Sequence, residues 1–186
     1  MLLYLNGKFV EEESAKVSSL DHGFLYGDGV FDTLRTYRGT LFMAEAHLDR
    51  LFKGAEQLQI KVPSKQQILD AMQETIKLNN LSEAKVRITV SRGAGDYSLS
   101  GKFCKPTVLI SAIELAPRPK QVYEFGVNAI TVDLQRQLPH IKSLNCLPSV
   151  LARIKADEVS AYEAILCDAN GYITEGTISN IFIIKN

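Results

Sequence analysis

The stretch I-K-S-L-N-C-L at residues 141–147 carries a lysine, Lys142, inside an otherwise apolar run. Ile141 and Leu144 flank this lysine, and Pro148 follows where the first turn of a helix is predicted. Partly desolvated surroundings near the positive end of a helix dipole favour the neutral amine, which attacks carbonyl groups. The chemistry to expect from such a lysine is a Schiff base. A lysine that extends its head group to solvent from a loop is the alternative interpretation.

Two further charged residues suit the same chemistry. Glu175 ends a short strand in G-Y-I-T-E-G, where the simplest interpretation is a solvated carboxylate at a strand edge. A fixed carboxylate there would instead keep the ring nitrogen of a pyridine-type cofactor protonated, which makes the ring a better electron sink. Arg50 lies opposite the apolar arc of its predicted helix, where it is either solvent-exposed or a clamp for a phosphate.

Strands and hairpins form much of the first block of the chain. The turn signals Asn6-Gly7 and Arg38-Gly39 each predict a β-hairpin. A glycine-rich loop at 93–101 separates the last two strands of the block. The strands predicted here are residues 1–5, 31–37, 40–43, 86–90 and 107–113.

Two amphipathic helices are predicted between these strands. From Glu45 onward apolar residues recur with the 3.6-residue period of an α-helix, and the pattern repeats from Ser64 after Pro63. The apolar arcs consist of Leu48, Leu51, Phe52, Ala55 and Leu58 in the first helix, and Ile68, Met72 and Ile76 in the second.

The proline-containing stretch A-P-R-P-K at 116–120 is typical of a linker. We therefore predict an N-terminal α+β domain at 1–115, a linker at 116–121 and the start of a second domain at 122–186. The second domain is short for an independent core, so we expect the chain to be a fragment. Its predicted elements are strands at 127–132, 164–167, 172–175 and 181–184 and a helix at 148–159.

The composition argues against several classes of protein. Acidic and basic residues both number 21, so the net charge is zero and no basic stripe suits a nucleic acid. No segment approaches the roughly 20 apolar residues that span a bilayer, and no signal peptide is evident, which predicts a cytoplasmic protein without a membrane partner. Cys104, Cys146 and Cys167 show no C-x-x-C spacing, which argues against a disulfide framework and a zinc site.

Two other enzyme-like interpretations have little support. His22, His47 and His140 could supply a metal hydrolase, but neither H-x-x-H nor H-E-x-x-H spacing occurs, so no metal is predicted. The segments G-D-G and R-G-A-G match neither fingerprint of a nucleotide phosphate loop.

Four ordered segments carry a more specific signal. They are D-H-G-F-L-Y-G-D-G-V-F-D-T-L-R (21–35), A-H-L-D-R-L (46–51), I-K-S-L-N-C-L-P-S-V-L-A (141–152) and D-A-N-G-Y-I-T-E-G-T-I-S-N-I-F-I-I-K (168–185). Together they resemble the class IV (fold type IV) pyridoxal-phosphate aminotransferases, which include branched-chain aminotransferases, D-amino acid aminotransferases and aminodeoxychorismate lyases. The resemblance implies a two-domain mixed α/β fold with an incomplete cofactor domain, pyridoxal 5′-phosphate as cofactor, and a homodimer.

Carried over residue by residue, the resemblance implies roles in cofactor binding and catalysis for three residues. Lys142 would form the internal aldimine and move the proton, Glu175 would pair with the pyridine nitrogen, and Arg50 would bind the cofactor phosphate. These roles agree with the chemistry expected from the residues themselves.

The resemblance also implies three substrate-binding positions. Tyr26 and Phe31 match positions that line the substrate pocket, with packing inside a hairpin as the alternative. Arg92 in V-S-R-G matches a position that meets a substrate carboxylate in some members, with a solvent-exposed loop arginine as the alternative.

The implied reaction is transamination between an amino acid and a 2-oxo acid, of D-amino acid or branched-chain type. Branched-chain enzymes commonly show F-E-G-I-R and a tyrosine where this chain has F-D-T-L-R and Cys146. Both differences favour the D-amino acid branch or, as an alternative, aminodeoxychorismate lyase, which forms 4-aminobenzoate. A truncated remnant that acts only as a binding module is the alternative from another class.

Overall fold

The structure is a computed structural model that describes residues 1–102 and 104–185. Its contacts divide the chain into two compact units, Met1–Ala116 with His140–Asn145, and Pro117–Pro139 with Cys146–Asn186. Both units mix helices and strands, in agreement with the predicted fold class. Residues 140–145 group with the first unit, although the sequence analysis assigned them to the second domain. Asn186, the predicted end of that domain, lies outside the described residues.

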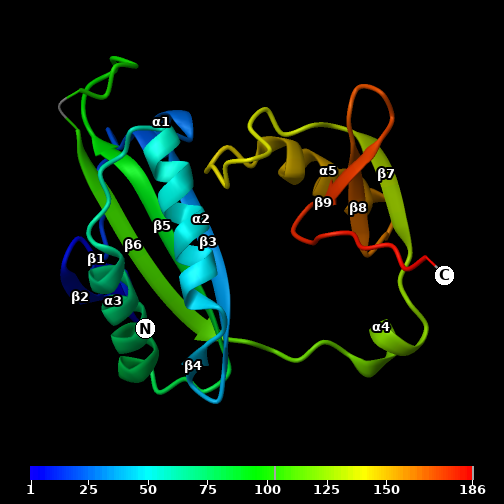
Figure 1. Cartoon of the computed structure of the whole chain (residues 1–186), viewed down its shortest axis with the longest axis horizontal. Coiled ribbons are helices and arrows are strands. Elements are labelled where there is room, and N and C mark those ends of the chain that lie inside the picture. The colour runs from blue at the N-terminus through cyan, green and yellow to red at the C-terminus, as the bar shows by residue number, and fades with distance from the viewer. Residues whose placement is uncertain (103, 186) are drawn as a thin grey trace. The chain divides into compact units, whose positions relative to one another are not determined.

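A six-stranded antiparallel sheet with the order β2-β1-β6-β5-β3-β4 forms the first unit (Figure 1). The strands are β1 (Leu2–Leu5), β2 (Lys8–Glu11), β3 (Gly29–Tyr37), β4 (Thr40–Leu41), β5 (Ala84–Ala94) and β6 (Lys105–Glu114). The helices are η1 (Glu12–Ser14), α1 (His22–Tyr26), α2 (Ala44–Gln57) and α3 (Lys65–Leu78).

Both predicted hairpins are confirmed, as β1–β2 and β3–β4. The turn residues Asn6 and Gly7 have φ angles of 49° and 91°, and Arg38 and Gly39 have 50° and 78°. Two consecutive positive φ angles are the conformation of a type I′ turn, whose twist matches that of the strands it joins.

Both predicted helices are confirmed as α2 and α3. Helix α3 begins with a capping box, in which the Ser64 hydroxyl accepts from the Gln67 amide and the Gln67 side chain accepts from the Ser64 amide. This arrangement satisfies two backbone donors that would otherwise lack partners, so it defines where the helix starts.

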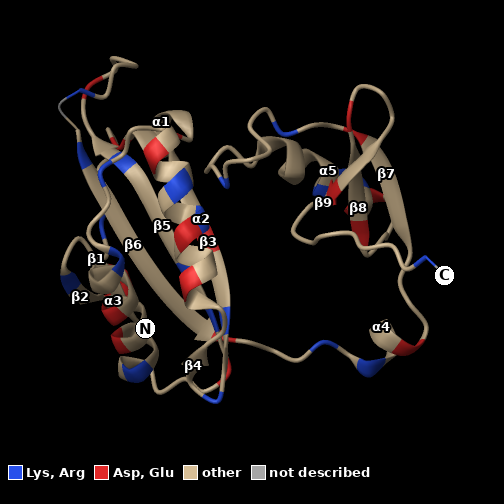
Figure 2. Ribbon diagram, viewed as in Figure 1, with Lys and Arg blue, Asp and Glu red and all other residues tan. Residues whose placement is uncertain are grey.

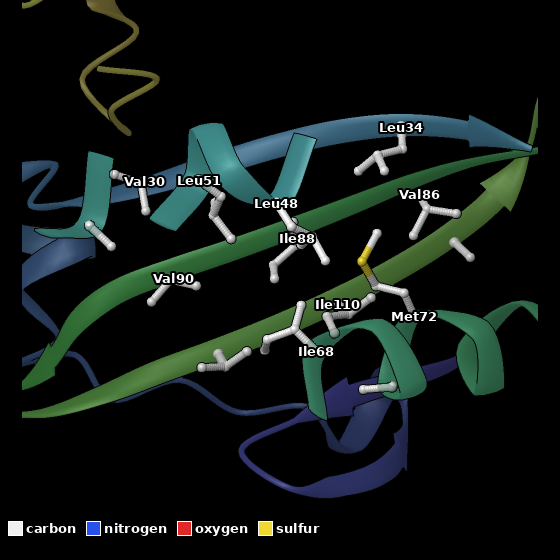
Figure 3. Close-up of a cluster of buried hydrophobic side chains, with 14 of the residues drawn as sticks. Val30, Leu34, Leu48, Leu51, Ile68, Met72, Val86, Ile88, Val90 and Ile110 are labelled. Carbon is white, nitrogen blue, oxygen red and sulfur yellow. The ribbon is translucent and has the colours of Figure 1, made fainter. Parts of the chain in front are cut away.

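The core of the first unit lies between one face of the sheet and helices α2 and α3 (Figure 3). Val86, Ile88 and Val90 of β5 point into this core because alternate residues of a strand face the same side. The intervening residues, such as Arg87, are half-buried on the opposite face, where the short helix α1 packs against Ser91 at the end of β5. We call the face that α2 and α3 cover the helix face, and the opposite face the open face.

The second unit holds a three-stranded sheet with the order β7-β8-β9, in which β7 and β8 are parallel and β8 and β9 antiparallel. Helix α5 packs on this sheet through Ala152 and Ala156, which are fully buried. Small alanine side chains allow a close approach between helix and sheet. The elements are α4 (Lys120–Glu124), β7 (Ala129–Asp133), α5 (Leu147–Glu158), β8 (Glu163–Cys167) and β9 (Ile173–Gly176).

One predicted strand of the second unit, at 181–184, is wrong. The structure has no strand there, and the side chains of Phe182, Ile183 and Ile184 are 88%, 89% and 96% exposed. A β-branched apolar run becomes a strand only where a neighbouring strand bonds to its backbone, and no described residue pairs with this segment.

Charged residues of both signs are interspersed over the elements of each unit (Figure 2). The acidic and basic residues of α2 are exposed, whereas Leu48, Leu51 and Ala55 are buried. Among the described residues, no helix is both long enough and apolar enough to cross a membrane.

Candidate active site

Residues 142–144 form a short edge segment beside β3. The Phe31 amide donates to the Lys142 carbonyl oxygen at 2.9 Å, and the Leu144 amide donates to the Gly29 carbonyl oxygen at 2.9 Å. Val30 and Ser143 face each other across this antiparallel bridge. Strand β4 pairs only with the other end of β3, so the segment fills the edge that β4 leaves open.

Close packing on α2 holds this edge segment. Ile141 is 6% exposed and belongs to the core of the first unit. A Cβ atom added at Gly54 of α2 would meet Val30 Cγ1 at 3.2 Å and Ile141 Cγ2 at 3.3 Å. The glycine therefore lets the helix approach both strands closely. Because Ile141 and Ser143 face the core, the intervening Lys142 points to the open face.

The Lys142 amine lies over the ring of Phe31. Nζ of Lys142 lies 4.8 Å from the ring centroid, and Cζ of Arg87 lies 3.8 Å from the same centroid. An aromatic ring attracts cations at such distances, so the ring orients both side chains. The sequence analysis did not single out Arg87. The signal that could have found it is its position on β5 opposite Thr33, on the face that carries Phe31.

Asp32, the next residue of β3, points to the helix face and binds Arg50 of α2. Arg50 donates from Nε to Oδ2 at 2.9 Å and from Nη2 to Oδ1 at 2.7 Å. His47 Nδ1 lies 3.0 Å from the same Oδ1. Asp32 itself is fully buried. Burial raises the pKa of Asp32, but the hydrogen bonds from Arg50 and His47 outweigh it and hold the pKa below its ordinary value.

Asp32 binds only one edge of the Arg50 guanidinium. Nε and Nη2 are bound to Asp32, and no described residue accepts a hydrogen bond from Nη1. The side chain is 49% exposed. Beside it lies an open hollow whose lining consists of Ala46, Asp49, Arg50, Lys53 and His140.

Tyr26 and Arg92, two predicted substrate residues, have protein partners. The Tyr26 hydroxyl donates to the Tyr97 carbonyl oxygen at 2.9 Å, and its ring lies edge-to-face with His22. Arg92 donates to both carboxylate oxygens of Asp28 and, from Nη2, to the Leu58 carbonyl oxygen at 2.7 Å. Arg92 is thus held in an ion pair rather than extended into solvent from a loop.

Glu175 belongs to the second unit, on β9 opposite Leu166. Its Oε1 lies 3.6 Å from Nη1 of Arg136, and its side chain is 31% exposed. The Glu175 carboxylate thus lies beside a guanidinium. The structure thus brings Lys142 and Phe31 together, whereas Glu175 belongs to the other unit.

The half-buried carboxylate of Glu163 fixes the turn that follows Glu175. Glu163 accepts hydrogen bonds from the Thr177 amide at 3.3 Å, from the Thr177 hydroxyl and from the Ser179 hydroxyl at 2.8 Å. Burial raises the pKa of Glu163, but these hydrogen bonds prevail and lower it. Sequence analysis missed Glu163 because its partners lie 14 and 16 residues further along the chain.

An amine, a guanidinium and a carboxylate are supplied by Lys142, Arg50 and Glu175. These are the chemical groups that suit a phosphorylated pyridine cofactor. Lys142 is oriented by the Phe31 ring, Arg50 is fixed by a buried acid, and Glu175 is paired with a cation. His22 Nε2 lies 2.9 Å from the Asp96 carbonyl oxygen, whereas His47 Nδ1 lies 3.0 Å from Asp32 Oδ1. The described residues hold no group of three or more potential metal ligands.

Comparison with known proteins decides the family. The amino-transferase class IV family matches residues 29–186. This chain belongs to the class IV aminotransferases. The match includes Phe31, Arg50, Lys142 and Glu175, and it confirms the resemblance drawn from the four sequence segments.

Related proteins of this family carry different activities. The chain is 48% identical over its whole length to a putative branched-chain-amino-acid aminotransferase of Methanocaldococcus jannaschii, of which it covers 66%. It is 34% identical to the D-alanine aminotransferase of Staphylococcus haemolyticus and 34% identical to the aminodeoxychorismate lyase of Bacillus subtilis. In these two comparisons it covers 66% and 64% of the relative.

Solved structures show the same fold. Over 95% of this chain, the branched-chain amino acid aminotransferase of Thermoproteus uzoniensis, solved with norvaline, superposes with a TM-score of 0.86 at 28% identity. The chain covers 63% of that protein. It therefore spans slightly less than two thirds of the length of the class IV aminotransferases that it matches.

Proposed function

We propose that this chain carries out pyridoxal-phosphate-dependent transamination between an amino acid and a 2-oxo acid. The observation that carries the proposal is the position of Lys142. An edge segment of the sheet holds its backbone by hydrogen bonds, and the Phe31 ring lies 4.8 Å from its amine on the open face. A lysine in a solvated loop would have neither constraint.

Lys142 acts as the general base and acid of the reaction. When bound, the cofactor supplies an electron sink for the bond broken at the substrate α-carbon. Nζ of Lys142 would take the proton from that carbon and hold it for its later return. The short edge segment limits the motion of the Lys142 backbone. This restricts the positions that Nζ can take during the proton transfer.

Arg50 and Glu175 bind the two ends of the cofactor. Arg50 donates from its remaining edge to the phosphate, because a planar guanidinium suits phosphate oxygens. Glu175 would keep the pyridine nitrogen protonated.

Arg87 binds a carboxylate of the substrate. Its guanidinium lies over the same Phe31 ring as the Lys142 amine, on the open face of the sheet. Arg92, which the family resemblance suggested for this role, already donates to Asp28 and Leu58. Phe31 and Tyr26 would form apolar walls for the substrate side chain.

A branched-chain amino acid is the first substrate to test. The 48% identical relative is named as a putative branched-chain-amino-acid aminotransferase, whereas the D-alanine aminotransferase and the lyase are each 34% identical. Substrate choice depends on few pocket side chains, so D-alanine is the second substrate to test.

A homodimer is the assembly that we propose. Phe24, Tyr97 and Leu99 are 77%, 75% and 79% exposed in the first unit. Large apolar side chains exposed in this way are typical of an interface. Light scattering at several protein concentrations would measure the mass of the assembly.

All three cysteines are free, which fits a reducing compartment such as the cytoplasm.

Reductive labelling tests the proposed function directly. The chain is incubated with pyridoxal phosphate and reduced with borohydride, and the modified peptides are mapped by mass spectrometry. We expect a pyridoxyl group on Lys142 and none in the Lys142→Ala variant. Lys105→Ala, which removes an exposed lysine of β6 in the same unit, serves as the control and should leave the labelling unchanged. Labelling scattered over exposed lysines, or none at all, would contradict the proposal for this chain.

A further inference from the structure

We propose that Asp32 is the positioning residue for the cofactor phosphate, acting through Arg50. This inference rests on the proposed function, since it concerns how Arg50 reaches the phosphate. The family resemblance implies no functional role for Asp32. Its place in the fold suggests one, because it is a fully buried carboxylate whose partners come from α2.

The geometry of the ion pair determines which edge of Arg50 is offered. Asp32 binds the guanidinium side-on, through Nε at 2.9 Å and Nη2 at 2.7 Å. A two-point contact fixes the plane of a guanidinium as well as its position. Arg50 also lines the hollow, together with Asp49, Lys53 and His140. Of these side chains, Lys53 can add positive charge beside an anion.

His47 completes the arrangement around the carboxylate. Its Nδ1 lies 3.0 Å from Oδ1 of Asp32 and 3.2 Å from Nη2 of Arg50. A guanidinium only donates and a carboxylate only accepts, so Nδ1 can satisfy one of these two neighbours. A proton on Nδ1 satisfies the buried Asp32, which then binds donors from His47, Arg50 and the Thr33 amide.

The place of Asp32 on β3 links Arg50 to Lys142. Asp32 follows Phe31, whose amide donates to the Lys142 carbonyl oxygen. Adjacent residues of one strand therefore hold the lysine on the open face and the arginine on the helix face. A change in the Asp32 contact would move the Arg50 guanidinium without breaking the hydrogen bond that holds Lys142.

Two ligands that differ only by the phosphate group test this role. Dissociation constants of pyridoxal phosphate and of pyridoxal are measured by fluorescence for the unchanged chain and for Asp32→Asn. We expect the affinity for pyridoxal phosphate to fall about tenfold, which is the order of the cost of ordering one long side chain. The affinity for pyridoxal should remain the same within about twofold, since Asp32 acts on the phosphate alone.

Further variants separate positioning from a general loss of structure. Asp32→Glu keeps the charge and should recover part of the phosphate-dependent affinity. Arg50→Gln should lose at least as much phosphate-dependent affinity as Asp32→Asn, and the double variant Asp32→Asn with Arg50→Gln should lose no more than Arg50→Gln alone, because Asp32 acts through Arg50. Glu83→Gln removes a different arginine–carboxylate pair, that of Arg35 at the far end of β3, and should change neither affinity.

Three results would overturn the inference. The first is an unchanged ratio of the two affinities in Asp32→Asn, and the second is an equal loss for both ligands, which indicates a loosened fold. The third is an additive loss in the double variant. If borohydride labels Lys142 in the unchanged chain but the ratio stays constant, only the role of Asp32 fails. If the unchanged chain neither binds pyridoxal phosphate nor is labelled on Lys142, both the role of Asp32 and the proposed function fail.

Discussion

Lys142 is held by Phe31 in two ways. The amide of Phe31 donates a 2.9 Å hydrogen bond to the Lys142 carbonyl oxygen, and the Lys142 amine lies 4.8 Å from the centroid of the Phe31 ring. One residue of β3 thus constrains both the backbone and the head group of the lysine. The first unit therefore contains the elements that orient the proposed catalytic amine.

Asp32 should make the stability of the first unit depend on pH. Its folded-state pKa is lowered from the ordinary value of 3.8, so its contribution is present above that value and is lost as pH falls through the folded-state pKa. Asp32 is buried but Arg50 is 49% exposed, so solvent stabilises the arginine left behind and the loss of their hydrogen bonds costs about 1–3 kcal/mol. We expect Asp32→Asn to lower the free energy of unfolding by that amount at pH 7, measured by urea denaturation.

The difference between the unchanged chain and Asp32→Asn should shrink as the pH falls from about 5 to about 2, where the carboxylate becomes protonated. Asp70→Asn, which removes an exposed carboxylate from α3, is the control and should change stability little. An equal effect of Asp32→Asn at both ends of this range would show that the ionised pair does not stabilise the fold.

Gly54 should be essential for the position of the edge segment. In Gly54→Leu the new side chain would collide with Val30 and Ile141, because each has a methyl carbon within 3.3 Å of the place that a Cβ atom would take. Overpacking a core typically costs about 1–3 kcal/mol. We expect lower thermal stability and slower borohydride labelling of Lys142. Glu56→Leu places the same side chain on the exposed face of α2, and if it slowed labelling equally, the contact with Ile141 would not be the cause.

Glu163 should hold the turn after Glu175 in place. Glu163→Gln removes the charge that accepts from Thr177 and Ser179, and leaving such donors unsatisfied costs about 1–3 kcal/mol. Because the folded-state pKa of Glu163 is lowered, its stabilisation is present above the ordinary value of 4.5 and is lost as pH falls through the folded-state pKa.

Hydrogen exchange of the Thr177 amide measures this effect. Exchange should be faster in Glu163→Gln than in the unchanged chain at neutral pH, and the two should approach each other in acid. Glu158→Gln alters an exposed carboxylate at the end of α5 and should leave the Thr177 amide as it was. Equal protection in both variants would contradict the role of Glu163.

Arg87 should affect substrate binding more than turnover. Removing one guanidinium that binds a carboxylate costs about 1.5–3 kcal/mol, so Arg87→Gln should raise the KM for 2-oxo acids by about ten- to a hundredfold. We expect a smaller change in kcat, measured in steady-state transamination assays. Arg35→Gln, which alters an arginine of β3 that binds Glu83, is the matched control. A fall in kcat with an unchanged KM would show that Arg87 does not bind the substrate.

Local sequence patterns predicted most of the elements correctly. The dipeptides Asn6-Gly7 and Arg38-Gly39 specify their turns through the backbone angles they accept, and Ser64 with Gln67 defines the start of α3. These signals act over a few residues and need no tertiary partner. The strand predicted at 181–184 failed because strand formation depends on a neighbouring strand, which the apolar pattern does not reveal.

The sequence by itself determined the family and the chemical identity of Lys142, Arg50 and Glu175, because ordered motifs record residue types and spacing. Only the tertiary structure decided which side chains meet. It grouped residues 140–145 with the first unit, joined Asp32 to Arg50 and brought Arg87 to the ring of Phe31. These pairings join residues from different elements, so their contacts follow from strand pairing and from packing helices on a sheet, which no local pattern encodes.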